Sequence, residues 1–199
     1  MPQGGVYFEQ GSGNLVAPSG TSVTFESGST TAIAGTLTIG GTELSATATE
    51  INRVCDTSAK VVSAAAATLA VTEALHDGKL IVLNKANGQA ITLPAASGSG
   101  ASFEFVVGTA ITSVGTTIKV ASASAIMAGT CLQTADGGDT VGAYETASDT
   151  DTITLNGTTT GGKVGDSVVI RDIAANLWAV RVVCAATGSE ATPFSATVS

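Results

Sequence analysis

Aromatic and charged residues are scarce in this chain. Of its 199 residues, 4% are aromatic and 12% are charged, whereas about a quarter of an ordinary soluble domain is charged. A coiled coil requires many Glu, Lys, Arg and Leu residues, so this composition excludes one. It also excludes a disordered polyelectrolyte, because 44% of the residues are hydrophobic.

Basic residues are the scarcer of the two charge types. The 8 Lys and Arg residues stand against 16 Asp and Glu, the net charge is −8, and no basic residue precedes Arg53. Nucleic-acid binding depends on Lys and Arg that neutralise phosphates, and an anionic membrane surface repels an acidic chain. We therefore expect no nucleic-acid and no membrane partner. The acidic N-terminal segment suits docking on a more basic protein, and solubility explains it equally well.

Cysteines are few and widely spaced. Cys55, Cys131 and Cys184 form no CxxC pair, which excludes a zinc ribbon and a redox motif. Each has apolar neighbours, so we expect buried, reduced thiols and assembly in a reducing cytoplasm. The N-terminus has no signal-peptide pattern, and the longest apolar stretch, within residues 64–71, is far shorter than a membrane span of about 20 residues. These features predict a soluble protein.

Small residues dominate what remains, with 24 Gly, many Ser and Thr, and apolar positions filled mostly by Ala, Val and Ile. Residues 1–41 contain short β-like segments bounded by Gly, Ser or Pro, and none is long enough to bury a core. This pattern predicts an extended arm that pairs with another molecule. The candidate contact residues of the arm are Tyr7, Phe8, Val23, Phe25, Ile33, Leu37 and Ile39.

Residues 42–58 are the best helix candidate and form a short linker. Thr47 and Glu50 match the capping box, in which the Thr hydroxyl accepts from the Glu amide and the Glu side chain returns to the Thr amide. Ala48, Ile51, Val54 and Cys55 would then share one helix face. A helix this short must pack on the domain or on a neighbouring subunit.

Residues 59–199 alternate strand-like segments with Gly and Asn turns, which predicts an antiparallel β-sandwich or barrel. Residues 72–78 resemble one helical turn that ends at Gly78. Asn87-Gly88 predicts a hairpin between residues 79–84 and 89–93. Further strands are expected at 102–107, after a flexible Ser/Gly segment at 97–100, and at 117–120, 140–145 and 152–155. A last hairpin is expected from 167–171 and 177–183.

Residues capable of catalysis or ligand binding are few. His76 beside Asp77 has no nucleophile motif with it, and the Gly-rich segment at 161–166 lacks phosphate-loop spacing. Asp136 and Asp139 could offer oxygens to Ca²⁺, but an EF-hand pattern is missing and a solvated turn explains them. We predict no catalytic, cofactor or metal site. The core aromatics are expected to be Phe103, Phe105 and Trp178.

Residues 41–53, with the sequence GTELSATATEINR, resemble a segment that recurs in tailed-bacteriophage virion proteins between a Gly/Thr-rich arm and a β domain. The stretches HDGK at 76–79, ITLPAASGSG at 91–100 and TITLNGTTTGG at 152–162 are similar to the same group. The resemblance runs from residue 41 to the C-terminus and is to phage head decoration, or cement, proteins and head-fibre proteins.

This resemblance implies a homotrimer that binds the major capsid protein on the outside of the virion, with no catalytic residue to carry over. The leading hypothesis is therefore a capsid decoration protein that stabilises the assembled head. A tail-fibre or baseplate adaptor involved in host attachment is the alternative. A capsule depolymerase is disfavoured, because no pair of carboxylates is marked by its surroundings.

Overall fold

The computed structural model describes residues 7–8, 15–16, 38–39, 41–47, 50–51, 60–137 and 140–198. The chain divides into two units, Met1–Glu50 and Ile51–Ser199, each described here by itself. Among the described residues, no helix is both long enough and apolar enough to cross a membrane.

In its described residues, the first unit contains two small antiparallel pairs of strands. β1 (Tyr7–Phe8) pairs with β2 (Leu15–Val16), and β3 (Thr38–Ile39) pairs with β4 (Thr42–Glu43). The sequence predicts β-like segments at 6–8, 23–25, 32–34 and 37–39, and strands are confirmed in the described residues of the first and the last of these, 7–8 and 38–39. The strand segments at 23–25 and 32–34 lie outside the described residues.

The capping box predicted in this unit is confirmed. The amide of Glu50 donates to Thr47 Oγ1 at 3.2 Å, and the amide of Thr47 donates to Glu50 Oε2 at 2.7 Å. Glu50 and Ile51 are helical, and residues 48–49 and 52–58 of the expected helix lie outside the described residues. Thr42 and Glu43, placed at the start of the helical linker by the sequence, form a strand instead.

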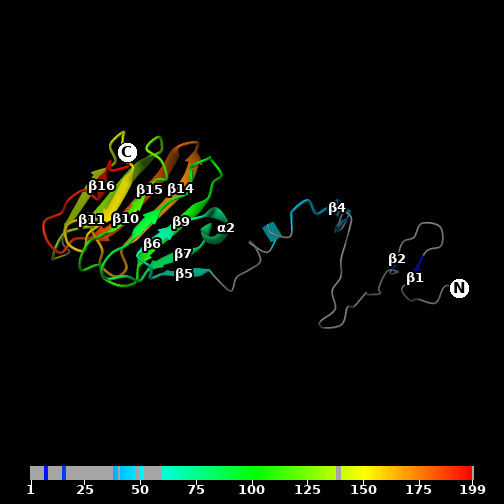
Figure 1. Ribbon diagram of the computed structural model, residues 1–199, viewed down its shortest axis with the longest axis horizontal. Helices are drawn as coiled ribbons and strands as arrows, with labels where there is room; N and C mark the ends of the chain where they lie inside the picture. Colours follow the sequence, from blue (N-terminus) through cyan, green and yellow to red (C-terminus); the bar gives the residue numbers. More distant parts are fainter. Residues whose placement is uncertain are drawn as a thin grey trace. The chain divides into compact units, whose positions relative to one another are not determined.

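The second unit is a β-sandwich of two mixed sheets (Figure 1). The seven-stranded sheet has the order β12-β11-β15-β14-β9-β7-β5, and the five-stranded sheet has the order β16-β13-β10-β8-β6. The larger sheet consists of β5 (Val61–Ala64), β7 (Leu80–Leu83), β9 (Ser102–Val107), β11 (Ile126–Thr134), β12 (Val141–Glu145), β14 (Ser167–Ala174) and β15 (Leu177–Ala185). The smaller sheet consists of β6 (Thr68–Ala70), β8 (Ala90–Thr92), β10 (Thr116–Lys119), β13 (Thr152–Leu155) and β16 (Phe194–Ser195).

The predicted sandwich is confirmed, and its first half is wound rather than folded into hairpins. From β5 to β10, successive strands alternate between the two sheets, so β5, β7 and β9 lie parallel in one sheet and β6, β8 and β10 lie parallel in the other. The hairpin predicted at Asn87-Gly88 is therefore wrong, because β7 and β8 belong to different sheets. The Asn-Gly turn carries the chain from one layer to the other.

Gly88 is needed at this crossing for two reasons. Its φ is +72°, and a Cβ atom added there would lie 1.9 Å from the carbonyl oxygen of Gly115. We expect Gly88→Ala to lower the free energy of unfolding by roughly 3 kcal/mol, since strain in the left-handed region adds to a backbone collision. Gly78→Ala is the matched control, because Gly78 has φ +68° and open space around it. Urea unfolding should show a loss of only about 1 kcal/mol there, and equal losses would contradict this explanation.

The second half of the sandwich follows the sequence prediction more closely. The last hairpin is confirmed as β14 and β15, with Asn176 at φ +60° in the turn. Strands are also confirmed near 102–107, 117–120, 140–145 and 152–155. The helical turn predicted at 72–78 is confirmed as α2 (Glu73–His76), followed by Gly78 at positive φ.

The core lies between the two sheets and contains the predicted aromatic residues. Phe103, Phe105 and Trp178 are fully buried, and the rings of Phe103 and Trp178 lie 5.9 Å apart between centroids. Ile91, Ile118 and Ile153 of the smaller sheet belong to the same cluster. Alternate residues on each strand thus face this core, and the others face away from it.

Candidate interaction face

The side of the seven-stranded sheet that points away from the core, called the outer face here, is crossed by two rows of aligned side chains. The strand registers define both rows. The charged row is Glu145, Thr130, Arg181, Val169, Glu104, Leu80 and Val61. The apolar row is Ala143, Leu132, Val183, Ser167, Val106, Val82 and Ser63. With seven strands about 4.8 Å apart, the face is roughly 30 Å wide.

The apolar row is exposed to an extent unusual for branched aliphatic residues. Leu132 is 50% exposed and its cross-strand neighbour Val183 is 47% exposed, while Val106 and Val82 are half-buried. The charged row ends in Val61, also exposed. The outer face of a sheet in a sandwich is ordinarily polar, so the adjoining exposed side chains of Leu132 and Val183 make this face a candidate interaction site.

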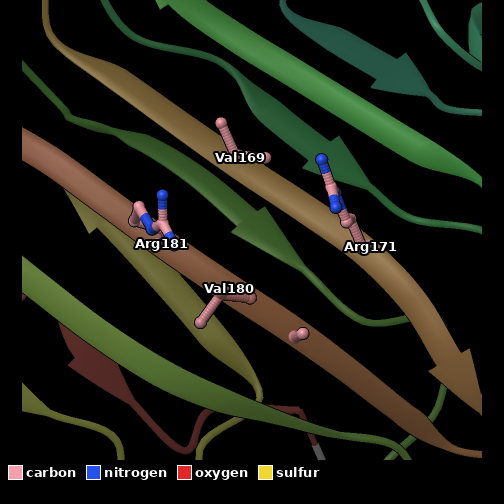
Figure 2. A pocket seen from close by; sticks show the side chains of 5 residues that line it. Val169, Arg171, Val180 and Arg181 are labelled. Carbon is pink, nitrogen blue, oxygen red and sulfur yellow. The ribbon is translucent and has the colours of Figure 1, made fainter.

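A shallow depression lies within the outer face, beside two arginines (Figure 2). Its volume is about 340 Å³, and it is lined by Val169, Arg171, Ala179, Val180 and Arg181. Figure 2 shows Val169 and Arg171 on β14, and Arg181 on the neighbouring β15. Within the described part of the chain, neither arginine has an ion-pair partner. Two unpaired guanidinium groups on an apolar surface are suited to a carboxylate from another molecule.

The loop at the β14 end of the sandwich is held by a buried carboxylate. Asp172 is 1% exposed and accepts hydrogen bonds from the amides of Ser97, Gly98 and Ser99 at 2.9, 2.8 and 3.0 Å. The hydroxyls of Ser97 and Ser99 donate to it as well. The Ser/Gly segment that the sequence predicts to be flexible is thus anchored at three successive amides.

This anchoring has a pH dependence with a defined sign. Burial raises the pKa of Asp172, but the amide hydrogen bonds from Ser97, Gly98 and Ser99 outweigh it and lower the pKa to about 2. A depressed carboxyl pKa stabilises the fold above the unfolded-state value, near 3.8, and that contribution is lost as the pH falls through about 2. We expect the difference in unfolding free energy between wild type and Asp172→Asn to shrink between pH 4 and pH 2. Urea titrations across that range would show it, and a constant difference would contradict it.

Two further buried carboxylates hold other loops. Asp166 accepts from the amides of Gly162, Lys163 and Ala185, and burial raises its pKa in spite of these hydrogen bonds. Asp151 accepts from the amides of Thr197 and Val198; burial opposes ionisation there, but the hydrogen bonds prevail and lower the pKa. Each of these carboxylates faces backbone donors of its own chain, so their role is structural.

The cysteines in the described part are buried, as predicted. Cys131 on β11 and Cys184 on β15 are free thiols whose Sγ atoms lie 3.7 Å apart in the core. The hydrogen bond shared with Cys131 and burial both raise the pKa of the Cys184 thiol. Cys55 lies outside the described residues.

The other residues singled out from the sequence are not brought together. His76 is buried in its turn, where Nδ1 accepts from the amide of Thr72 at 3.1 Å. Asp136 is exposed and Asp139 lies outside the described residues; in the part that is described, no three His, Cys, Asp or Glu side chains could jointly hold a metal ion. For the arm candidates Tyr7, Phe8 and Ile39, the backbone is described and the side chains are not, whereas Val23, Phe25, Ile33 and Leu37 lie outside altogether.

The residues of the outer face are those that the sequence prediction missed. Alternation within the predicted strands carried a signal: Val169, Arg171, Ala179, Arg181 and Val183 occupy the positions between core residues, and three of these five are apolar. A strand that is apolar on both faces needs two partners, one of them the core.

The chain matches no protein-family model, no curated protein and no solved structure. The β-sandwich is therefore defined by the strand order and the registers alone.

Proposed function

We propose that the protein is a virion structural protein of a tailed bacteriophage, a decoration protein that binds the outside of the assembled head as a homotrimer and stabilises it. The observation that carries this proposal is the outer face, where exposed Leu132 and Val183 lie beside unpaired arginines. Such a face has no evident use in an isolated chain. The resemblance of residues 41–199 to phage decoration and head-fibre proteins supplies the biological setting.

The N-terminal arm is the proposed contact with the major capsid protein. Its short strands offer backbone groups to the edges of capsid strands, and Tyr7 and Phe8 would anchor it, because aromatic side chains are enriched at interface hot spots. Three arms on one trimer would act together, so weak single contacts would combine into tight attachment. Because the trimer binds only the assembled shell, it would stabilise that shell by mass action.

The test is to add the purified full-length chain to heads that lack it and to measure co-sedimentation and resistance to heat. We expect binding and a higher disruption temperature, and we expect a variant with Tyr7→Ala and Phe8→Ala to bind more weakly. Isolated tails are incubated in parallel. Binding to tails and not to heads would overturn the proposal in favour of a tail-fibre or baseplate adaptor.

A further inference from the structure

We infer that the outer face packs against the same face of another copy of this chain, with Arg181 of each copy paired to Glu104 of the other. This inference rests on the self-association in the proposed function, but not on the number of three copies or on attachment to a phage head. It identifies the surface and the charge pair by which the copies recognise each other.

The charges of the charged row are arranged symmetrically about β14. Arg181 on β15 and Glu104 on β9 both pair in register with Val169 on β14, so the arginine lies on one side of that strand and the glutamate on the other. Their backbones are two strands, or roughly 10 Å, apart. In the part of the chain that is described, neither side chain has an ion-pair partner. Each charge is thus available to a second molecule.

A single rotation axis places each of the two charges opposite its counterpart in the other copy. If a two-fold axis runs parallel to β14 and in front of it, the β15 side of one copy meets the β9 side of the other. Arg181 then faces Glu104. The apolar row matches in the same way, because Val183 meets Val106 and Leu132 meets Val82 across the axis. Packed sheets about 10 Å apart allow such side chains to interdigitate.

Self-complementarity favours a second copy over a foreign partner. An acidic foreign protein would be drawn to both arginines, whereas a second copy uses only Arg181. Arg171 lies on β14 itself, close to the proposed axis, so copies of Arg171 would approach each other. The depression beside Arg171 leaves room for its side chain to turn towards water. Removing Arg171 should therefore leave the association between copies unchanged or make it tighter, whereas it should weaken binding to an acidic partner.

The experiment is a charge exchange in the full-length chain, followed by molar mass across a dilution series. We expect Arg181→Glu alone, and Glu104→Arg alone, to shift the dissociation midpoint at least 10-fold to higher concentration. In the double variant, which carries both substitutions, the midpoint should lie within about threefold of the wild-type value. Lys119→Glu makes the same charge change on β10 of the other sheet and should have no effect. Arg171→Ala should leave association unchanged or tighter. Thermal unfolding of each variant confirms that it is folded.

Two outcomes would overturn the inference. One is a single variant that is folded and retains the wild-type midpoint; the other is a folded double variant that stays dissociated. If the single variants keep their mass but lose binding to heads, the face contacts the shell instead, and the proposed function stands without this interface.

Discussion

Replacing Asp172 by alanine is expected to lower the free energy of unfolding by roughly 3 kcal/mol. The reason is the number of donors that converge on one buried carboxylate: three successive amides, from Ser97 to Ser99, and two serine hydroxyls. A hydrogen bond to a charged group contributes more than a neutral one, and the side chain that accepts all of them is 1% exposed. The loop at residues 97–100 is exposed, so in the Asp172→Ala variant water replaces part of the hydrogen bonding that its amides and hydroxyls lose.

The matched control is Asp149→Ala, because Asp149 is exposed and lies on a turn. We expect its unfolding free energy to stay within about 0.5 kcal/mol of wild type. Urea unfolding of both variants, at one protein concentration, makes the comparison. Equal effects from the two substitutions would mean that Asp172 does not anchor the loop.

Placing charges in the apolar row is expected to abolish self-association while leaving the fold intact. Leu132 and Val183 are neighbours in register. The double variant Leu132→Lys with Val183→Glu therefore places opposite charges side by side, and these charges compensate each other within one chain. Across an interface, however, the same side chains must be desolvated against Val82 and Val106. We expect the association constant to fall on the order of 100-fold, together with binding to heads.

Val164→Glu serves as the control for that double variant, because Val164 is 65% exposed and lies in a loop. It should retain both self-association and binding. If the double variant has the wild-type molar mass and the wild-type thermal midpoint, the outer face is not an interface.

The elements predicted well from the sequence are those with a local signal. The capping box of Thr47 and Glu50, the turn ending at Gly78 and the β14–β15 hairpin all depend on residues close in sequence. The prediction of a hairpin at Asn87-Gly88 was wrong because the dipeptide specifies a positive φ at Gly88 and does not specify which strands it joins. The partners of β7 and β8 are chosen by burial of their apolar faces in two different layers.

β11 was missed altogether, and with it the strand of the outer face that carries Leu132. Residues 126–134 mix Ala, Gly, Thr and Gln with larger apolar residues, so their alternation is weak in sequence. Position 129 requires glycine, because a Cβ atom there would lie 1.8 Å from the carbonyl oxygen of Val180 on β15. Close contact with β15, from a distant part of the chain, fixes this strand.

The buried carboxylates were also missed, although one had a visible signal. Asp172 falls at the inward position that follows Val168 and Ile170, where an unpaired charge would be costly. Its donors are supplied by residues 97–99, more than seventy positions earlier, and no spacing rule connects the two segments. The Ser/Gly composition that suggested flexibility is what frees these amides to converge on one acceptor.

The low charge and the branched aliphatic residues of the chain are explained together by this face. A sheet whose outer side carries an apolar row beside the charged one needs fewer charged positions than a sheet that faces water throughout, and it is suited to a partner. A chain in which the outer positions of β15 and β11 include Val183 and Leu132 is suited to assembly.

The most direct measurement is the molar mass of the purified full-length chain by light scattering, over a range of concentrations. Association through the outer face gives at least twice the chain mass of 19.4 kDa, and the mass falls on dilution or on substitution in the charged or the apolar row. A constant mass of 19.4 kDa at every concentration would contradict the account, because a stable monomer leaves the outer face without a second copy.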